Sequence, residues 1–262
     1  MIEKPLILIA NDDGYQAKGL RKLVELMRSI GRVVVVTTEQ PMSAQSHSIT
    51  TNIPLRYRLH QKSNDYMMYI CNGRPADCIK LGYQQIMEQL PDLVVSGINH
   101  GSNASVNVVY SGTMGAVIEA CMANIPAVGF SLDCYDSDAV FDHVDDYVLD
   151  ISDKVLTKGL PAGVCLNVNF PKFSDEAIKG VKVCRQAKAR WVESFDKRRD
   201  PMGRDYFWVT GIFIEDECEE DTDIYALNNN YVSVVPSHYD WTSYSALKTV
   251  NGWFENNNFD IK

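Results

Sequence analysis

The stretch Leu6-Ile7-Leu8-Ile9-Ala10-Asn11-Asp12-Asp13-Gly14 decides the fold class of this chain. Its first five residues form a continuous apolar run, which is typical of a β-strand buried on both faces. The four residues that follow are all polar turn formers or glycine. Strands of this kind belong to parallel sheets covered by helices, so the run predicts an α/β protein. It also places two acidic side chains directly after the first strand.

The next segment has the spacing of an amphipathic helix, and a second buried strand follows at residues 33–36. The apolar positions of the helix fall on one face; they are Leu20, Leu23, Val24, Met27 and Ile30. Gly31 is well placed to end this helix. A strand, a helix and a strand in this order form a βαβ unit, which predicts parallel strands joined by a right-handed crossover.

The same alternation continues along the chain. Strands are expected at residues 92–96, 127–132 and 164–169, with helices at residues 113–123 and 139–156. Together these elements predict an open, doubly wound, mostly parallel sheet with helices on both faces.

After about residue 176 the pattern changes. Strand-like runs at residues 181–184, 206–210 and 231–235 are separated by polar stretches at 188–204 and 215–223, and residues 245–254 favour a terminal helix. The segment 198–204 is expected to be an exposed loop. We therefore predict one domain over residues 1–262, with a core at 1–176 and a β-hairpin extension and C-terminal arm at 177–262.

Composition restricts the class of partner. The formal net charge is −9 and the sequence pI is near 5.0, which disfavours a nucleic-acid polymer as the main partner. A single local site can still bind a small phosphate ester. No apolar run approaches the ~20 residues of a membrane span. The seven cysteines lack a CxxC pair, and the N-terminus has no signal-peptide pattern, so we expect buried, reduced thiols and a cytoplasmic location.

Asp12 and Asp13 stand where ligands bind in an open α/β sheet, beyond the carboxyl end of a strand. Two adjacent carboxylates repel each other unless a proton or a cation offsets their charge. A hard divalent cation with oxygen ligands is the natural partner. The alternative is an exposed turn, because residues 11–14 are all turn formers.

Two polar loops follow later strands. Ser43, Ser46 and Ser48 come after the second strand, where hydroxyls would complete a metal shell or bind phosphate oxygens. Asn99 follows the strand at 92–96 and brings an amide oxygen to the same edge. The neighbouring glycines would let the backbone approach a ligand closely. In both cases an ordinary polar loop is the alternative.

Ser111, Gly112 and Thr113 precede the helix expected at 113–123. Such a helix start supplies free backbone N–H groups, hydroxyls and the positive end of the helix dipole, which together bind anions. Ordinary N-capping by Ser111 or Thr113 is the alternative. Three strand ends with hard-oxygen groups beside an anion site predict metal-dependent phosphoryl chemistry.

At this point the chain resembles the SurE family, the survival-protein-E nucleotidases. The likeness covers nearly the whole chain in order, and the Asn-Asp-Asp-Gly and Ser-Gly-Ile-Asn segments are together specific. The matching segments are residues 7–14, 43–50, 73–78, 94–101, 110–113, 231–236 and 238–240.

The resemblance implies hydrolysis of nucleoside 5′-monophosphates to nucleoside and phosphate on a Rossmann-like core. It implies a divalent cation held by four residues, which are Asp12, Asp13, Ser43 and Asn99. Mg²⁺ or Mn²⁺ suits such hard-oxygen ligands better than softer ions do. It also implies homodimers or homotetramers built partly by exchanged C-terminal arms.

The phosphate contacts implied by the resemblance are Asn103, Ser111, Gly112 and Thr113. The chain departs from the family pattern at three places. Ala44 replaces the usual glycine after the metal-binding serine, Lys18 replaces a frequent proline, and Ala104-Ser105-Val106-Asn107 replaces the usual Leu-Gly and acidic residues. The last of these loops is expected to bear on substrate choice.

By this interpretation a water attacks phosphorus in line, with Asp12, Asp13 and Asn99 as the catalytic residues. Asp12 or Asp13 would help to remove the proton of the water, and His100 is a candidate donor to the leaving 5′-oxygen. A polyphosphate or general phosphomonoester hydrolase with the same site is an alternative. A non-catalytic phospho-accepting receiver module is a remote one, because residues 96–99 lack its acceptor Asp and the chain is about twice too long.

Overall fold

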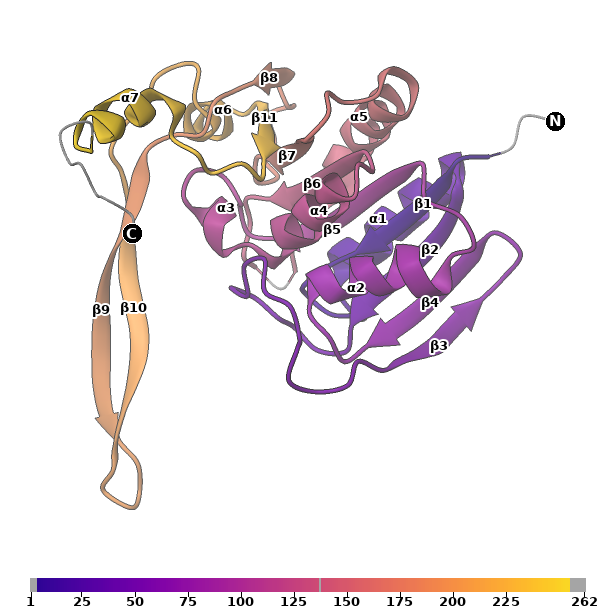
Figure 1. The fold of residues 1–262 in the computed structure, drawn as a ribbon, viewed down its shortest axis with the longest axis horizontal. Coiled ribbons are helices and arrows are strands. Elements are labelled where there is room, and N and C mark those ends of the chain that lie inside the picture. Colours follow the sequence, from indigo (N-terminus) through magenta and orange to yellow (C-terminus); the bar gives the residue numbers. More distant parts are fainter. Residues whose placement is uncertain (1–3, 137, 255–262) are drawn as a thin grey trace, which may run out of the picture.

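The computed structural model describes residues 4–136 and 138–254. Residues 1–3 of the predicted N-terminal start and residues 255–262 of the predicted C-terminal arm lie outside the described residues. The described chain forms a nine-stranded sheet of order β3-β4-β2-β1-β5-β6-β7-β11-β8 and a separate two-stranded ribbon of β9 and β10. Figure 1 shows the ribbon projecting away from the sheet.

Six neighbouring strands of the large sheet are parallel, which confirms the predicted mostly parallel α/β fold. They are β1 (Leu6–Ala10), β2 (Arg32–Thr38), β4 (Tyr66–Cys71), β5 (Leu93–His100), β6 (Ala127–Leu132) and β7 (Val164–Phe170). β3 (Tyr57–Lys62) is antiparallel to β4, and β11 (Val232–His238) is antiparallel to β7. The short β8 (Val181–Val183) pairs in parallel with β11.

Helices cover both faces of this sheet (Figure 1). The first strand shows why, because its alternate side chains enter two different cores. Ile7 and Ile9 pack in the core beneath α1 (Lys18–Ile30) and α5 (Asp145–Lys158). Leu8 and Ala10 pack in the core beneath α2 (Pro75–Leu81) and α4 (Gly112–Met122). The doubly wound arrangement is therefore confirmed.

The first helix ends where the sequence predicts. Leu20, Leu23 and Met27 are fully buried on its inner face, and burying each such side chain stabilises the fold by ~1.5–3 kcal/mol. Gly31 follows the helix, and its N–H donates to the Met27 carbonyl at 2.9 Å. A Cβ at position 31 would lie 2.6 Å from the Pro5 carbonyl oxygen, so only glycine fits there.

The exposed loop expected at residues 198–204 is slightly shorter than predicted, and most of the polar stretch 188–204 is a strand. Residues Ala189–Arg199 form strand β9, which pairs antiparallel with β10 (Asp205–Glu215) over eleven residue pairs. Both faces of this ribbon are largely exposed, so its strands lack the hydrophobic alternation that marks a half-buried strand. Only residues 200–204 form the expected loop.

Several elements escaped prediction because they are short or lack a clear period. The helix expected at 139–156 begins instead with a 3-10 turn at Asp142–Val144 and becomes α-helical at Asp145. Besides β3, β4 and α2, the further elements are a π-helix (Gly82–Ile86), α3 (Asn107–Tyr110) and α6 (Asp223–Asn228). The terminal helix expected at residues 245–254 is present as α7 (Tyr244–Gly252).

Six of the seven cysteines are buried free thiols, as expected, but Cys218 is exposed because it lies in the polar segment before α6. Within residues 4–136 and 138–254, none of the helices combines the length and the apolar character needed to cross a membrane.

Candidate active site

A cavity of about 490 Å³ lies at the carboxyl ends of β1 and β5 and extends to the β9–β10 ribbon. Its lining contains five of the residues singled out from the sequence; they are Asp12, Ser43, Asn99, Asn103 and Ser111. His100 lines it as well. The volume falls within the ~300–1,000 Å³ of small-molecule sites. The arrangement follows from the parallel sheet, which brings the ends of its strands to one edge.

The turn after β1 is fixed by hydrogen bonds, so it is not a freely exposed turn. The Asn11 side chain donates to the Gly14 carbonyl at 3.0 Å and accepts from the Thr37 hydroxyl at 2.5 Å. The Met42 N–H donates to the Asp12 carbonyl at 2.6 Å. These bonds tie the loop that carries Ser43 to the turn that carries the two aspartates.

Burial disfavours the charged forms of Asp12 and Asp13. Burial and, second to it, the charge of Asp13 raise the pKa of Asp12 to about 6, against a hydrogen bond from Thr113 that lowers it. Burial also raises the pKa of Asp13, against a hydrogen bond from the His100 N–H at 3.2 Å. Among the described residues that line the cavity there is no Lys or Arg.

Asn99 reaches the site because β5 is irregular. The pairing of β5 with β6 shifts in register between Ser96 and Asn99, and such a bulge redirects the side chains that follow it. The Asn99 Nδ2 then donates to the Gly101 carbonyl at 2.7 Å. This bond identifies the other end of the amide, Oδ1, as the atom available to a ligand.

The donor set fits a hard divalent cation. Asp12, Ser43 and Asn99 line one cavity, and Asp13 adjoins it through its bond to His100. Carboxylate, hydroxyl and amide oxygens are the donors that Mg²⁺ and Mn²⁺ prefer. No group of three or more His, Cys, Asp or Glu residues capable of holding a metal occurs in the described part of the chain, so the set would rely on two carboxylates and neutral oxygens.

The start of α4 lies against Asp12. The Ser111 hydroxyl accepts from the Met114 N–H at 3.0 Å, so Ser111 is the N-cap and also lines the cavity. Thr113 is fully buried, and its hydroxyl donates to Asp12 Oδ1 at 2.5 Å. A Cβ on Gly112 would lie 2.7 Å from Asp12 Oδ2. Glycine at this position therefore permits the close approach of the helix start to the carboxylate.

Ser46 lies apart from the cavity. Its hydroxyl donates to the Val109 carbonyl at 2.7 Å, and its N–H donates to the Tyr110 carbonyl at 3.0 Å. The same loop is held to α4 by His47, whose Nε2 lies 2.9 Å from Glu119 Oε2. Lys80 contacts the other oxygen of Glu119 at 2.5 Å. Ser46 and His47 thus fasten the loop that delivers Ser43.

Asn103 is anchored by a buried polar network beneath the cavity. Its Nδ2 donates to the Ser131 hydroxyl at 2.8 Å, and its N–H donates to Asn169 Oδ1 at 2.8 Å. Its carbonyl accepts from Asn167 Nδ2 at 2.9 Å. The signal for this network was present in the sequence of β7, where Asn167 and Asn169 interrupt an apolar strand at alternate positions.

The second wall of the cavity comes from the ribbon and was missed from the sequence. Trp191 from β9 is the aromatic residue of this wall, and two further aromatic residues line the cavity, Tyr135 from the loop after β6 and Tyr110 from α3. The remaining ribbon residues of this wall are Glu193, Val209, Thr210 and Gly211. The sequence signal for this wall was the presence of aromatic residues, such as Trp191, within the polar stretch 188–204.

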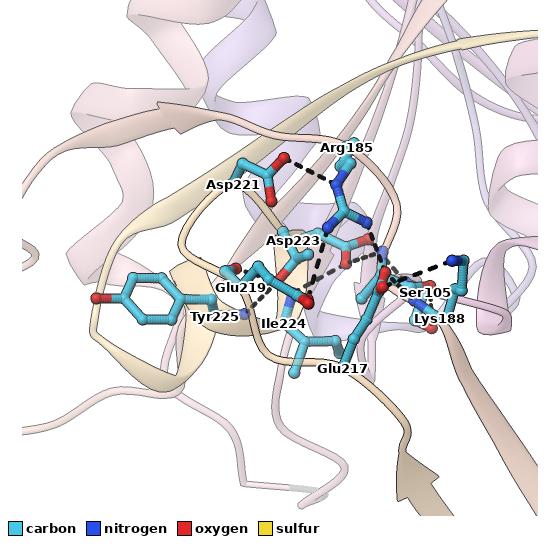
Figure 2. Close-up of polar contacts among 11 residues, drawn as sticks. Ser105, Arg185, Lys188, Glu217, Glu219, Asp221, Asp223, Ile224 and Tyr225 are labelled. Atoms are coloured by element: carbon cyan, nitrogen blue, oxygen red, sulfur yellow. Dashed lines mark hydrogen bonds and ion pairs between the residues drawn. The ribbon is translucent and has the colours of Figure 1, made fainter.

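The base of the ribbon is clamped to the loop that carries Asn103. Buried Asp223 accepts from the N–H groups of Ser105 at 2.7 Å and Ala187 at 2.9 Å, and the Ser105 hydroxyl donates to the Ala187 carbonyl at 2.9 Å. Figure 2 shows Ser105 and Asp223 beside Arg185, whose guanidinium contacts three acidic side chains. Those three are Glu217, Glu219 and Asp221.

Comparisons with known proteins match this arrangement. The profile of the family described as survival protein SurE matches residues 7–193. A Flavobacterium psychrophilum protein named 5′-nucleotidase SurE is 51% identical over 253 residues, which cover 96% of this chain and 98% of that protein. A Thermoanaerobacter protein of the same name is 40% identical over 247 residues, which cover 94% and 97%.

The crystal structure of the SurE protein from Aquifex aeolicus superimposes with a TM-score of 0.81 at 40% identity, covering 95% of this chain and 99% of that one. The fold, the order of the matching segments and this extent of identity agree with the resemblance drawn from the residues. The chain therefore belongs to the survival protein SurE family.

Proposed function

We propose that the protein is a metal-dependent 5′-nucleotidase that hydrolyses nucleoside 5′-monophosphates to nucleoside and phosphate. The observation that carries this proposal is the cavity in which Asp12 meets the start of α4. It joins a carboxylate pair suited to a cation with a helix start suited to a phosphate. The name 5′-nucleotidase SurE, borne by relatives 51% and 50% identical to this chain, supports the same activity.

Asp12, Asp13, Ser43 and Asn99 would hold the cation, Mg²⁺ or Mn²⁺. When bound, a divalent cation supplies Lewis-acid polarisation of the phosphoryl group and of a water. Thr113 keeps Asp12 in place through its hydrogen bond, and the His100 N–H does the same for Asp13. Either carboxylate can then take the proton of the attacking water.

The phosphoryl group would lie at the start of α4. Ser111 lines the cavity there, and the first backbone N–H groups of the helix can stabilise charge on the phosphoryl oxygens. Asn103, held by its buried network, supplies a further polar contact. His100 lines the cavity and is the side chain that we assign as donor to the leaving 5′-oxygen.

A polyphosphate is a poorer fit than a monophosphate. Glu193 places a carboxylate on the ribbon wall, and the described residues that line the cavity include no Lys or Arg. A chain of several phosphates would meet repulsion there without compensation. Other phosphomonoesters with an uncharged leaving group fit the same site.

A phosphate-release assay tests the proposal. The substrates are AMP, GMP, CMP, UMP and tripolyphosphate, each with Mg²⁺, with Mn²⁺ or after exhaustive EDTA treatment with the metal content checked. We expect release from the nucleotides only with a divalent cation. Full activity of the metal-free protein would refute the metal dependence. Release from tripolyphosphate alone would refute the nucleotidase.

The homo-oligomeric state and the cytoplasmic location belong to the same proposal. The exposed apolar side chains of the ribbon, such as Phe195 and Trp208, support association between copies of the chain. Free thiols at all seven cysteines support a reducing compartment.

A further inference from the structure

Trp191 is the aromatic residue that the ribbon contributes to the lining of the cavity. We propose that Trp191 is the platform on which the base of the nucleotide stacks, so that this residue sets the preference for nucleotides over other phosphomonoesters. This inference rests on the proposed nucleotidase activity. Trp191 would contact the nucleoside, which is the leaving group, whereas the residues described above would contact the cation and the phosphate.

Hydrogen bonding and packing fix the orientation of the Trp191 ring. The indole N–H donates to Asn107 Oδ1 at 2.9 Å, and the Phe213 ring lies edge-on to the indole with centroids 5.3 Å apart. Trp191 is nevertheless 41% exposed and lines the cavity. A rigid, partly exposed ring of this kind loses little conformational freedom when a flat ligand stacks on it.

The clamp at the base of the ribbon fixes the backbone that carries this ring. Asp223 binds Ser105 and Ala187 together, and Ala187 precedes β9 by two residues. Lys188 adds a bond from its N–H to Glu217 Oε1 at 2.8 Å, which joins the two strands at their base. The base of the ribbon is therefore tied to the loop that carries Ser105, through Asp223 (Figure 2).

The residues around Trp191 leave space for a base. Gly211 lies opposite Glu193 in the ribbon, and a Cβ at position 211 would come within 3.5 Å of the Trp191 ring. The missing side chain keeps the ring accessible. Glu193 carries an acceptor and repels anions, so it suits the hydroxyl or amino donors of a nucleoside rather than a second phosphate.

The chemistry of the wall identifies a nucleobase as the occupant. A purine base has a π-face of about the size of an indole and a pyrimidine base a smaller one, and stacking on an aromatic side chain is tolerant of base identity. The cavity holds the phosphate-binding elements and this ring together in about 490 Å³. A single nucleotide would span both walls, whereas a sugar phosphate would contact only the strand ends.

The experiment compares AMP with ribose 5-phosphate, which has the same phosphate and sugar but no base. Trp191→Ala should lower kcat/KM for AMP by about tenfold or more, chiefly through KM, and leave ribose 5-phosphate unchanged. Trp191→Phe retains a ring and should recover most of the AMP activity. Phe173→Ala is the control, because Phe173 is an aromatic residue 50% exposed outside the ribbon and does not line the cavity.

Adenosine provides a readout that does not depend on turnover. It should inhibit ribose 5-phosphate hydrolysis by the wild type and fail to inhibit the Trp191→Ala variant. Equal losses on both substrates, or no loss on AMP, would overturn the inference. If the wild type released no phosphate from either compound, the proposed function would fail. The stacking site would then be judged by whether adenosine quenches tryptophan fluorescence in the wild type and not in Trp191→Phe.

Discussion

The Thr113 hydroxyl donates a hydrogen bond of 2.5 Å to Asp12 Oδ1, across 101 residues of sequence. Thr113 therefore does not cap its own helix, a task that falls to Ser111. Because its hydroxyl proton is engaged by Asp12, we expect Thr113 to affect catalysis by positioning this carboxylate. The direct phosphate contact that the resemblance implies for Thr113 stays a prediction.

Thr113→Val should lower both stability and turnover. Valine keeps the shape but removes the donor to a buried carboxylate, which costs about 1–3 kcal/mol of unfolding free energy. Turnover should fall by roughly 10²-fold, because Asp12 loses the group that orients it. The inhibition constant of inorganic phosphate should change little, since the Thr113 hydroxyl faces Asp12. Melting temperature, kcat and phosphate inhibition are measured together.

Thr157→Val is the control for that change, because Thr157 is exposed on α5 and far in sequence from the site. It should leave kcat unaltered. A Thr113→Val protein with normal turnover would show that the bond to Asp12 is structural only. If inorganic phosphate inhibited the Thr113→Val protein much less strongly than the wild type, the Thr113 hydroxyl would have to contact the phosphate directly.

Asp13→Ala should nearly abolish turnover while the fold survives. The side chain is a proposed cation ligand, and the loss of a charged group that acts on the transition state costs roughly 10²–10³ in kcat or more. Stability of the metal-free protein should hold or rise, because the change removes one of two repelling carboxylates. Glu88→Ala, at an exposed position, is the control. Near-normal kcat at saturating Mg²⁺ would contradict the role.

Glu119 should make stability depend on pH in the acid range. Burial raises the pKa of this carboxyl, but bonds and charges from His47 and Lys80 outweigh burial and lower it overall. A lowered pKa means that the ionised form stabilises the fold above the ordinary value of 4.5, and that this contribution is lost as pH falls below it. Thermal unfolding of the wild type and Glu119→Gln, from pH 3 to 7, should therefore converge at low pH. A difference in melting temperature between the two proteins that stayed constant from pH 3 to 7 would exclude this contribution of Glu119.

The chain should form homodimers or homotetramers. Exposed apolar side chains gather on the ribbon, and monomers rarely keep such surfaces free; they include Phe195, Phe207, Trp208 and Ile212. Sedimentation at micromolar concentration should give a multiple of the 29.5 kDa chain mass. A monomeric mass would count decisively against association. If the ribbon mediates it, Phe195→Ser with Ile212→Ser should lower the mass, whereas Phe173→Ser, exposed outside the ribbon, should not.

The parts of the fold that were predictable have a local signature. The run 6–14 combines an apolar strand with turn formers, and the helix that ends at Gly31 has a clear period. Strand β9 lacks such a signature because both of its faces meet solvent. Its pairing with β10 depends on residues that follow it in the chain.

The same distinction applies to the site. Asp12, Asn99 and Ser111 were identifiable because strand ends and helix starts are places that local sequence marks. Trp191 was not, because its contact with Asn107 joins residues 84 apart through the docking of the ribbon. Ser46 is the opposite case, because the sequence of its loop predicted a substrate contact that the fold does not form. Its hydroxyl donates to the Val109 carbonyl and does not line the cavity.

The position of β11 between β7 and β8 has a consequence for biosynthesis. As the chain leaves the ribosome, β7 is complete at residue 170 but its outer edge stays unpaired until residues 232–238 emerge. An unpaired strand edge invites pairing with other chains. Nascent chains stalled at residue 220 should therefore sediment with aggregates, whereas chains released at full length should not. Pairing of β11 with β7 would cover the open strand edge. Completion of translation would therefore be the step that protects the new chain from aggregation.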